Sequence, residues 1–215
     1  MVLKLSNFRE INIGKIFPSL LFRSNHPICN GRQVDDIILY ANNAKIKTII
    51  NLSDDIYSIK SKLVYSPWYK GMFEGGNVIA LNINMKFDVR NDGFKKRVKD
   101  GLLFMIERKP PYLIHCEAGI DRTGFFSIIL GALMEAAFDD VVRDYMLSFV
   151  DENEYSVNDY NKGSIFLRNL FSDIKGELIG SNENIHKLSK KYLVEDVGLN
   201  INEVKKLVDL LMAVF

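Results

Sequence analysis

In the first two thirds of the chain, short runs of β-branched and apolar residues alternate with stretches in which apolar residues recur at helical spacing. The short runs predict strands; these lie at 20–22, 48–52, 78–83 and from Tyr112 onward. The stretches between them predict helices; these lie at 31–43, from Asp92 as N-cap to the residues before Pro110, and at about 122–137. This alternation predicts an α/β fold built on one sheet.

Two further regions follow a different pattern. Residues 54–77 are polar and aromatic and contain a proline and three glycines, so they predict a loop-rich excursion with little regular structure. After residue 138 the pattern predicts only helices, at 141–149, 165–174, 185–193 and 201–214. The last has a capping-box pattern at Asn200 and Glu203. We therefore expect one domain, 1–215, with a core of about 1–150 and a helical extension of about 151–215 packed on it.

Composition narrows the class of protein without naming a function. The 215 residues are 47% hydrophobic and 26% charged, and the net charge of +1 provides no global attraction to nucleic acid. No apolar run approaches the ~20 residues of a membrane helix, so no integral membrane segment is predicted. The first 15 residues lack a signal-peptide pattern and only Cys29 and Cys116 occur, so we expect a cytoplasmic protein without disulfides or a zinc site, although another secretion route stays open.

The stretch 112–124, YLIHCEAGIDRTG, carries the clearest chemical signal. It begins as a buried strand, passes through a short loop and leaves as the apolar helix predicted at 122–137. That helix is apolar nearly all round, which indicates a position in the middle of the domain. Cys116 and Arg122 stand at the two ends of the loop with five residues between them. This spacing suits a loop that holds a phosphate while a thiolate attacks it.

Each residue type in this loop suits that chemistry. A helix N-terminus and a neighbouring arginine favour the thiolate form of a cysteine such as Cys116. Successive backbone N–H groups can bind an anion; the residues in question are Glu117, Ala118, Gly119 and Ile120. Arg122 can bind two phosphate oxygens at once, and the Thr123 hydroxyl can hydrogen-bond the sulfur. We predict that a phosphate or sulfate ion binds here and that His115 is a buried support of the loop.

The ten residues 115–124 match the HCxxGxxRTG signature of cysteine-dependent protein tyrosine phosphatases. Weaker similarity extends over most of the chain: FRS at 22–24, IINL at 49–52 and DYMLS at 144–148 resemble segments of the atypical, dual-specificity-like bacterial branch of that family. The resemblance implies a protein tyrosine phosphatase-like α/β fold, with a central, mostly parallel sheet flanked by helices and a helical C-terminal portion. It also implies two-step hydrolysis of phosphotyrosine, and of phosphoserine or phosphothreonine in dual-specificity members. The intermediate would be a phosphocysteine, with no metal or organic cofactor.

The general acid that protonates the leaving oxygen has two candidates. Asp88 follows the strand predicted at 78–83, where this fold usually supplies the acid. Asp121 directly precedes the loop arginine, as in myotubularin-like and bacterial lipid-active phosphatases, where that aspartate has been given acid–base roles. We prefer Asp88 over Asp92, which we assign to a helix cap, and keep Asp121 as the rival.

Other assignments stay open on the sequence alone. Asp121 and Glu117 also resemble features of phosphatases that act on inositol polyphosphates or phosphoinositides, so such a substrate is the alternative to a phosphorylated protein. An alternative of another class is a pseudophosphatase that binds phosphorylated partners without cleaving them. By resemblance, Arg23 is expected to bind substrate or to support the site. The basic run at 95–99 is most simply a solvated helix face, with attraction of a polyanion as the minority view, and Cys29 is an incidental thiol.

Overall fold

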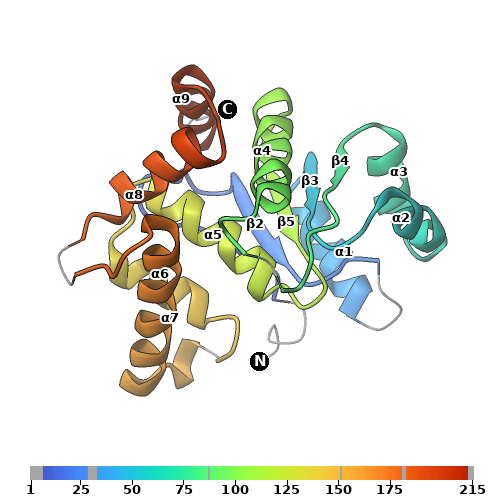
Figure 1. Ribbon diagram of the computed structural model, residues 1–215. Coiled ribbons are helices and arrows are strands. Elements are labelled where there is room, and N and C mark those ends of the chain that lie inside the picture. Colours follow the sequence, from blue (N-terminus) through green and yellow to red (C-terminus); the bar gives the residue numbers. More distant parts are fainter. Residues whose placement is uncertain (1–6, 29–32, 87, 151, 181–182, 213–215) are drawn as a thin grey trace.

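The computed structural model describes residues 7–28, 33–86, 88–150, 152–180 and 183–212 (Figure 1); Cys29 lies outside these ranges. Five strands form one sheet in the order β1-β2-β5-β3-β4. They are β1 (Arg9–Glu10), β2 (Leu21–Ser24), β3 (Thr48–Asn51), β4 (Val78–Ala80) and β5 (Tyr112–His115). All neighbouring pairs are parallel except β1 and β2, which are antiparallel at the edge. The predicted mostly parallel sheet is confirmed.

Helices cover both faces of the sheet because its central strands are buried on both sides. In β5, Tyr112 and Ile114 belong to one hydrophobic cluster and Leu113 to the other, as the alternation of side chains along a strand requires. The cluster around Leu113 is closed by helices that lie together in Figure 1: α1 (Gln33–Asn43), α2 (Ile56–Lys62), the short η1 (Leu63–Tyr65) and α3 (Pro67–Glu74). The larger cluster is closed by α4 (Asp92–Glu107), α5 (Asp121–Leu133) and the C-terminal helices.

The C-terminal helices pack on this second face. They are α6 (Phe138–Met146), η2 (Glu152–Glu154), α7 (Val157–Lys175), α8 (Ile185–Lys191), the π-helical η3 (Tyr192–Asp196) and α9 (Ile201–Met212). The Ser189 hydroxyl donates to the Ile129 carbonyl at 2.8 Å, and the Tyr192 hydroxyl donates to the Val89 carbonyl at 2.9 Å. Residues of α5 from Arg122 to Leu133 are buried, as expected for a helix that is apolar on all sides. Across the described ranges, no helix has the length and apolarity needed to cross a membrane.

Two predicted features are wrong. Residues 54–77 form helices, since the Asp55 and Ser66 side chains cap α2 and α3, and Pro67 occupies the first turn of α3, where its missing N–H costs nothing. The N-cap of α4 is Asn91, whose side chain accepts from the Phe94 amide at 3.1 Å. Asp92 instead forms an ion pair with Lys95.

Element boundaries also differ from the pattern. The predicted strand 78–83 is shortened to β4, and the two-residue β1 gave no signal because it is too short to show a period. The predicted Asn200–Glu203 capping box is confirmed, with reciprocal bonds of 2.8 and 2.9 Å. The assignment of the whole chain to one domain stays a prediction.

Candidate active site

The loop between β5 and α5 is held from behind through its carbonyl groups. The Glu117 carbonyl accepts from the His26 amide at 3.1 Å, and the Ala118 carbonyl accepts from Asn7 Nδ2 at 2.9 Å. The Gly119 carbonyl accepts from Arg23 Nη2 at 2.9 Å. Because a trans peptide is planar, an N–H points opposite to the carbonyl of the preceding residue. The N–H groups of residues 118–120 are therefore directed to the other side of the loop, as an anion cradle requires.

Gly119 allows the loop to lie against β2. Its φ of +69° belongs to the left-handed region, and a Cβ at this position would lie 2.5 Å from the Ser24 carbonyl oxygen. Any side chain would push the loop away from the strand and from its supporting donors. The close approach of loop and strand therefore depends on glycine.

Arg23 lies behind the loop and is fully buried. Besides Gly119, its guanidinium contacts Asp144 Oδ2 at 2.9 Å and the Ser148 hydroxyl at 3.0 Å. Arg9 binds the same aspartate and the same serine. The buried guanidinium thus supports the loop, one of the two roles expected for Arg23, and its role in substrate binding stays a prediction.

Arg23 remains positively charged although it is buried. Burial and the nearby Arg9 lower the pKa of Arg23 to about 10, while Asp144 works against this change. The guanidinium is therefore protonated at neutral pH.

Arg122 connects the start of α5 to the segment after β4. Its Nη1 donates to the Ile83 carbonyl at 3.0 Å, and the residue is only 5% exposed. Its Nε is buried and makes no hydrogen bond to any described residue. A buried N–H of this kind has an unmet need for an acceptor. A phosphate oxygen would meet it.

Cys116 and its neighbours are also buried. Cys116 is 2% exposed, and the Thr123 hydroxyl makes no hydrogen bond within the described part of the chain. The predicted Thr123–Cys116 bond is therefore not formed in this conformation; the unmet hydroxyl keeps its capacity to bond a thiolate. His115 Nε2 lies 3.0 Å from the Tyr69 hydroxyl. Burial holds the pKa of the His115 imidazole well below its usual value, so the ring is neutral, and its role as a support of the loop stays a prediction.

The two candidate acids line one hollow of about 540 Å³, which reaches the start of α5 at Asp121. Asp121, the first residue of α5, is exposed, and so is Asp88, which accepts from the Arg90 amide at 2.9 Å. α7 supplies the opposite wall through Phe166, Asn169, Leu170 and Asp173. Of the other loop residues, Glu117 and Ala118 are exposed and Ile120 is half-buried. The structure brings Asp88 and Asp121 together and does not separate their roles.

Asp88 also lines a second hollow, of about 460 Å³, on its other side. The lining includes Ile83, whose carbonyl holds Arg122, together with Lys86 and Arg97. The side-chain oxygen of Asn84 accepts a hydrogen bond from the Lys86 amide, and that of Asn91 accepts one from the Phe94 amide. The NH₂ groups of both asparagines therefore remain available as donors. This second hollow is polar and rich in donors, whereas the first combines an apolar wall with three carboxylates and Arg90.

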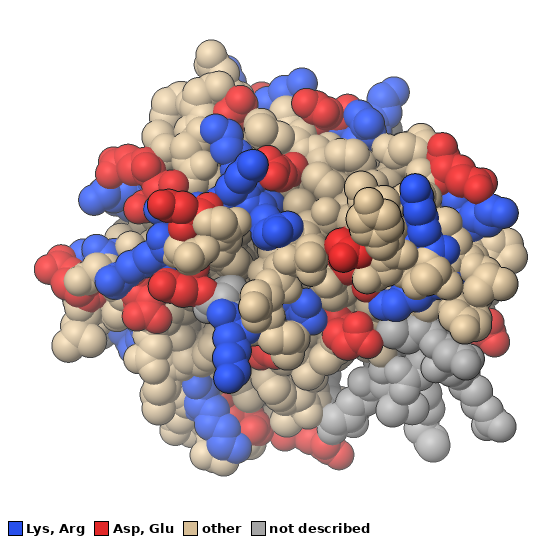
Figure 2. Space-filling model, turned by 45° about the vertical axis from the view of Figure 1, so that its right-hand side comes forward, with Lys and Arg blue, Asp and Glu red and all other residues tan. Residues whose placement is uncertain are grey.

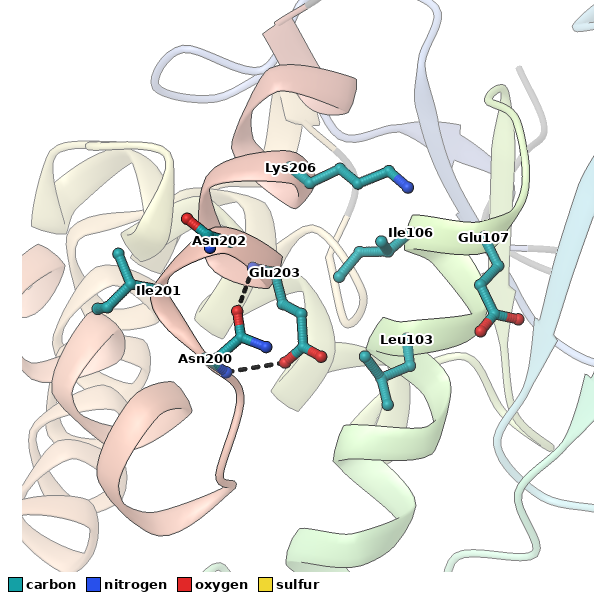
Figure 3. Close-up of a pocket in the computed structure, with 8 residues that line it drawn as sticks. All are labelled: Leu103, Ile106, Glu107, Asn200, Ile201, Asn202, Glu203 and Lys206. Atoms are coloured by element: carbon teal, nitrogen blue, oxygen red, sulfur yellow. Dashed lines mark hydrogen bonds between the residues drawn. The ribbon is translucent and has the colours of Figure 1, made fainter.

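A third hollow, of about 480 Å³, lies between α4 and α9 and contains none of the predicted site residues (Figure 3). Asn200 and Glu203, which project into it, bond each other in the cap of α9. This hollow is therefore a groove between two packed helices and is not part of the candidate site. On the face shown in Figure 2, Lys and Arg are interspersed with Asp and Glu, and neither sign gathers into a single patch.

Several residues of the site were missed in the sequence. Asn7, His26, Asn51, Asp54 and Tyr69 all contact the loop or the side chains beneath it. The available signal was positional, since His26, Asn51 and Asp54 are polar residues at or just after the carboxyl ends of β2 and β3. In parallel sheets these ends gather at one edge, where ligands bind. Asn7 and Tyr69 gave no such signal.

Comparison with solved structures gives distant similarity along most of the chain. TpbA of P. aeruginosa is 16% identical with a TM-score of 0.49, covering 89% of this chain and 94% of that one. A variant of TpbA in complex with pTyr is 15% identical with a TM-score of 0.49, covering 89% and 93%. The core catalytic domain of the PP-IP phosphatase SIW14 from S. cerevisiae is 16% identical with a TM-score of 0.44, covering 82% and 94%.

Comparison with protein families gives a direct assignment. No curated protein was found to match this sequence. The model of the tyrosine phosphatase family, however, matches residues 82–213, more than half of the chain. The match includes the whole loop between β5 and α5, residues 116–120, named the phosphate loop from here on. The protein belongs to the tyrosine phosphatase family.

Proposed function

We propose that this protein hydrolyses phosphotyrosine monoesters through a phosphocysteine intermediate at Cys116. The proposal rests on the direction of the loop's backbone groups and on the Nε of Arg122, which is unbonded among the described residues. The carbonyls of the loop are bound from behind, so its amides face forward, and the buried Nε of Arg122 lacks an acceptor. This arrangement supplies several donors for one tetrahedral anion beside a cysteine. It supports phosphate binding and attack by sulfur at the same place.

In the first step, the Cys116 thiolate forms an S–P bond while the P–O bond to the leaving group breaks. The loop amides and Arg122 bind the non-bridging oxygens, whose charge they stabilise in the transition state. Asp88 in its protonated form gives its proton to the leaving oxygen, so that a neutral phenol departs. Asp121 lines the same hollow and is the alternative donor.

In the second step, the carboxylate takes a proton from water, whose oxygen attacks phosphorus as the S–P bond breaks. Inorganic phosphate leaves, and both the acid and the thiolate are restored. The unmet hydroxyl of Thr123 can stabilise the departing thiolate. His115 is neutral and serves only as support.

The hollow beside α7 favours an aryl phosphate over a polyanion. Its apolar wall, with Met85, Val89, Phe166 and Leu170, suits a flat ring that adjoins the phosphate. Asp88, Asp121 and Asp173 line the same hollow together with Arg90; the three carboxylates outnumber this guanidinium and would repel the further phosphates of an inositol polyphosphate. Both properties favour phosphotyrosine.

The second hollow supports a second candidate, an inositol phosphate or phosphoinositide phosphatase. Lys86, Arg97 and the asparagine NH₂ groups could bind a second phosphate of the substrate there. The comparison that decides is the ratio of kcat/KM values for a phosphotyrosine peptide, inositol hexakisphosphate and a phosphoinositide. We expect the peptide to have the highest value; a strong preference for either inositol compound would replace the first candidate with the second.

The basic test of the proposal uses the two cysteines. Cys116→Ser should abolish hydrolysis of p-nitrophenyl phosphate and retain binding of inorganic phosphate, whereas Cys29→Ser should keep both. All assays contain EDTA and a reductant. Turnover by Cys116→Ser at the wild-type rate would remove the proposed nucleophile. Phosphate binding without turnover by the wild-type protein would instead favour a phospho-binding pseudophosphatase.

A further inference from the structure

The turn that carries Asp88 is held on two sides by the C-terminal helices. On one side, the Tyr192 hydroxyl donates to the Val89 carbonyl at 2.9 Å. On the other side, Arg90 Nε donates to the Asp173 carbonyl at 2.6 Å, in the last turn of α7, where helix carbonyls lack partners inside the helix. These two contacts span 103 and 83 positions of the chain. The position of the candidate acid therefore depends on residues far along the sequence.

One peptide group connects Tyr192 with the carboxyl group of Asp88. The Val89 carbonyl, which accepts from Tyr192, and the Arg90 amide belong to the same planar unit and point in opposite directions. The Arg90 amide donates to Asp88 Oδ1 at 2.9 Å. The Asn91 amide donates to the Asp88 carbonyl at 3.0 Å and closes the turn. Tyr192 therefore restrains the rotation of the peptide group whose other side binds the carboxyl group.

The bond from the Arg90 amide makes the two carboxyl oxygens of Asp88 unequal. Oδ1 is engaged as an acceptor, so in the protonated acid the proton is carried by Oδ2. A donor to the Val89 carbonyl also polarises this peptide group and strengthens its N–H as a donor. If the peptide group rotated, Oδ1 would be released, and the carboxyl group would turn about a side-chain torsion that is broad in aspartate.

Tyr192 is itself fixed in place and in protonation state. It is 2% exposed, and its ring meets that of Phe125 edge-on, with 6.3 Å between centroids. It begins η3, in which the Val197 amide donates to the Tyr192 carbonyl at 2.9 Å, the spacing of a π-helix; such turns are rare and frequent at functional sites. Burial and the carboxylates of Asp196 and Asp88 raise the pKa of Tyr192, so its hydroxyl stays protonated and donates.

We propose that Tyr192 is a positioning residue for Asp88: through the Val89–Arg90 peptide group it holds the carboxyl group in one orientation, with the oxygen that carries the proton free for the leaving group. The inference rests on the proposed function, because it takes Asp88 as the general acid. It assigns the placement of that acid to the C-terminal helices, which contribute no residue to the phosphate loop. The competing explanation is that the Tyr192 bond only adds stability.

The dependence of the rate on the leaving group separates these two explanations. Tyr192→Phe keeps the ring and removes the hydroxyl, so it should lower kcat for phenyl phosphate about 3- to 10-fold, the worth of one hydrogen bond. For p-nitrophenyl phosphate, whose leaving group needs little protonation, kcat should be almost unchanged. Both KM values should stay the same. In an Asp88→Asn background, Tyr192→Phe should have no further effect, because the acid that it positions is absent.

The matched control is Tyr112→Phe. It also removes a buried tyrosine hydroxyl that donates to a main-chain carbonyl, that of Met105 in α4, at 2.8 Å. This hydroxyl holds the end of α4 and not the turn at Asp88. Tyr112→Phe should therefore lower the free energy of unfolding and leave the ratio of the two kcat values unchanged. An equal change of that ratio in both variants would overturn the inference.

The contact can also be observed without turnover, by NMR. The amide proton of Arg90 should shift downfield when Asp88 ionises, because its acceptor becomes charged. Asp88→Asn identifies this shift by abolishing it. Tyr192→Phe should lose most of the shift, and Tyr112→Phe should keep it.

A full Arg90 shift in Tyr192→Phe, or an unchanged ratio of its two kcat values, would contradict the inference. A further loss of rate when Tyr192→Phe is added to Asp88→Asn would also contradict it. A lost shift in a protein that hydrolyses neither aryl phosphate would support the positioning of Asp88 and sink the proposed function. Normal turnover with an unchanged shift would do the reverse.

Discussion

The two sides of the phosphate loop are built in opposite ways. Behind the loop, Arg23, His26 and Asn7 bind three successive carbonyls, and the side chains there are almost all buried. In front, Asp88 and Asp121 stand exposed at the edges of open hollows. The back leaves the loop little freedom to adopt another shape, and the front leaves room for a substrate. We infer that the back determines the chemistry of the site and the front determines its substrate.

The largest expected effect concerns the front. Replacing the general acid with asparagine should lower kcat by about 10²–10⁴-fold and remove the fall in rate at high pH, where the acid loses its proton. We expect this from Asp88→Asn, with a far smaller loss from Asp121→Asn. The sharper assay compares phenyl phosphate with p-nitrophenyl phosphate, since a poor leaving group depends more on protonation. The reverse order of the two variants would transfer the role to Asp121.

The second prediction concerns the side chains behind the loop, whose loss should lower the stability of the protein. Asp144→Ala leaves the guanidinium of Arg23 buried without its counterion, which should lower the free energy of unfolding by about 3–5 kcal/mol. The control is Lys15→Ala, which breaks an exposed ion pair with Glu135 and should leave the free energy of unfolding almost unchanged. Urea unfolding measures both. Similar small losses in the two variants would mean that the loop does not depend on this buried pair.

Low pH should also lower the free energy of unfolding, through the buried side chains behind the loop. His115 resists protonation when folded, because burial lowers its pKa, but it gains a proton below about pH 6.5 when unfolded. The unfolded state then binds more protons, so stability falls as the pH drops below this value, with a slope of up to about 1.4 kcal/mol per pH unit. Urea unfolding at several pH values should show this slope in the wild type and a reduced slope in His115→Asn. An unchanged slope in the variant would assign the effect elsewhere.

Asp54 extends this dependence to lower pH. Although burial opposes it, the hydrogen bonds from His26, Lys62 and Asn51 lower the pKa of Asp54. The stability that this carboxylate contributes is present above about pH 4, where the unfolded residue is also ionised, and is lost as the pH falls further. The two groups thus act in the same direction and in successive pH ranges.

The smallest effect concerns the wall of the front hollow. Phe166→Ala removes a ring that stacks on Tyr145 with 4.4 Å between centroids, and it should raise the KM for a phosphotyrosine peptide about fivefold. Arg97→Ala, in the other hollow, should leave that KM unchanged. The reverse result, together with a loss of activity on inositol hexakisphosphate in Arg97→Ala, would show that the substrate occupies the basic hollow.

The sequence was sufficient for those parts of the site whose residues are neighbours in the chain. Cys116, Arg122 and the loop amides lie within one strand–loop–helix unit, so their spacing alone predicted their arrangement. The α/β sheet was likewise predicted from the alternation of apolar strands and helices, and its mostly parallel order was what the family resemblance implied. The short helices α2 and α3 were missed because their stability comes from caps and from packing, and not from an amphipathic period.

The supports behind the loop were beyond the reach of any local pattern. Arg23 meets Asp144 across 121 positions, and Asn7 meets Ala118 across 111. Only the register of the sheet brings such residues together. The choice between Asp88 and Asp121 stayed open for a different reason: both line one hollow, and only a reaction separates their roles.

These long separations bear on how the protein acquires its site during folding. The Arg23–Asp144 and Asn7–Ala118 contacts each close a loop of more than a hundred residues. Such contacts form late, because the chain loses the entropy of closing the loop before it gains the energy of the contact. Helix α5 can form early, but the phosphate loop takes its shape only when β1, β2 and α6 have met. A refolding chain should therefore regain its helical signal before it regains affinity for phosphate, and a ribosome must release α6 before the enzyme can bind its first substrate.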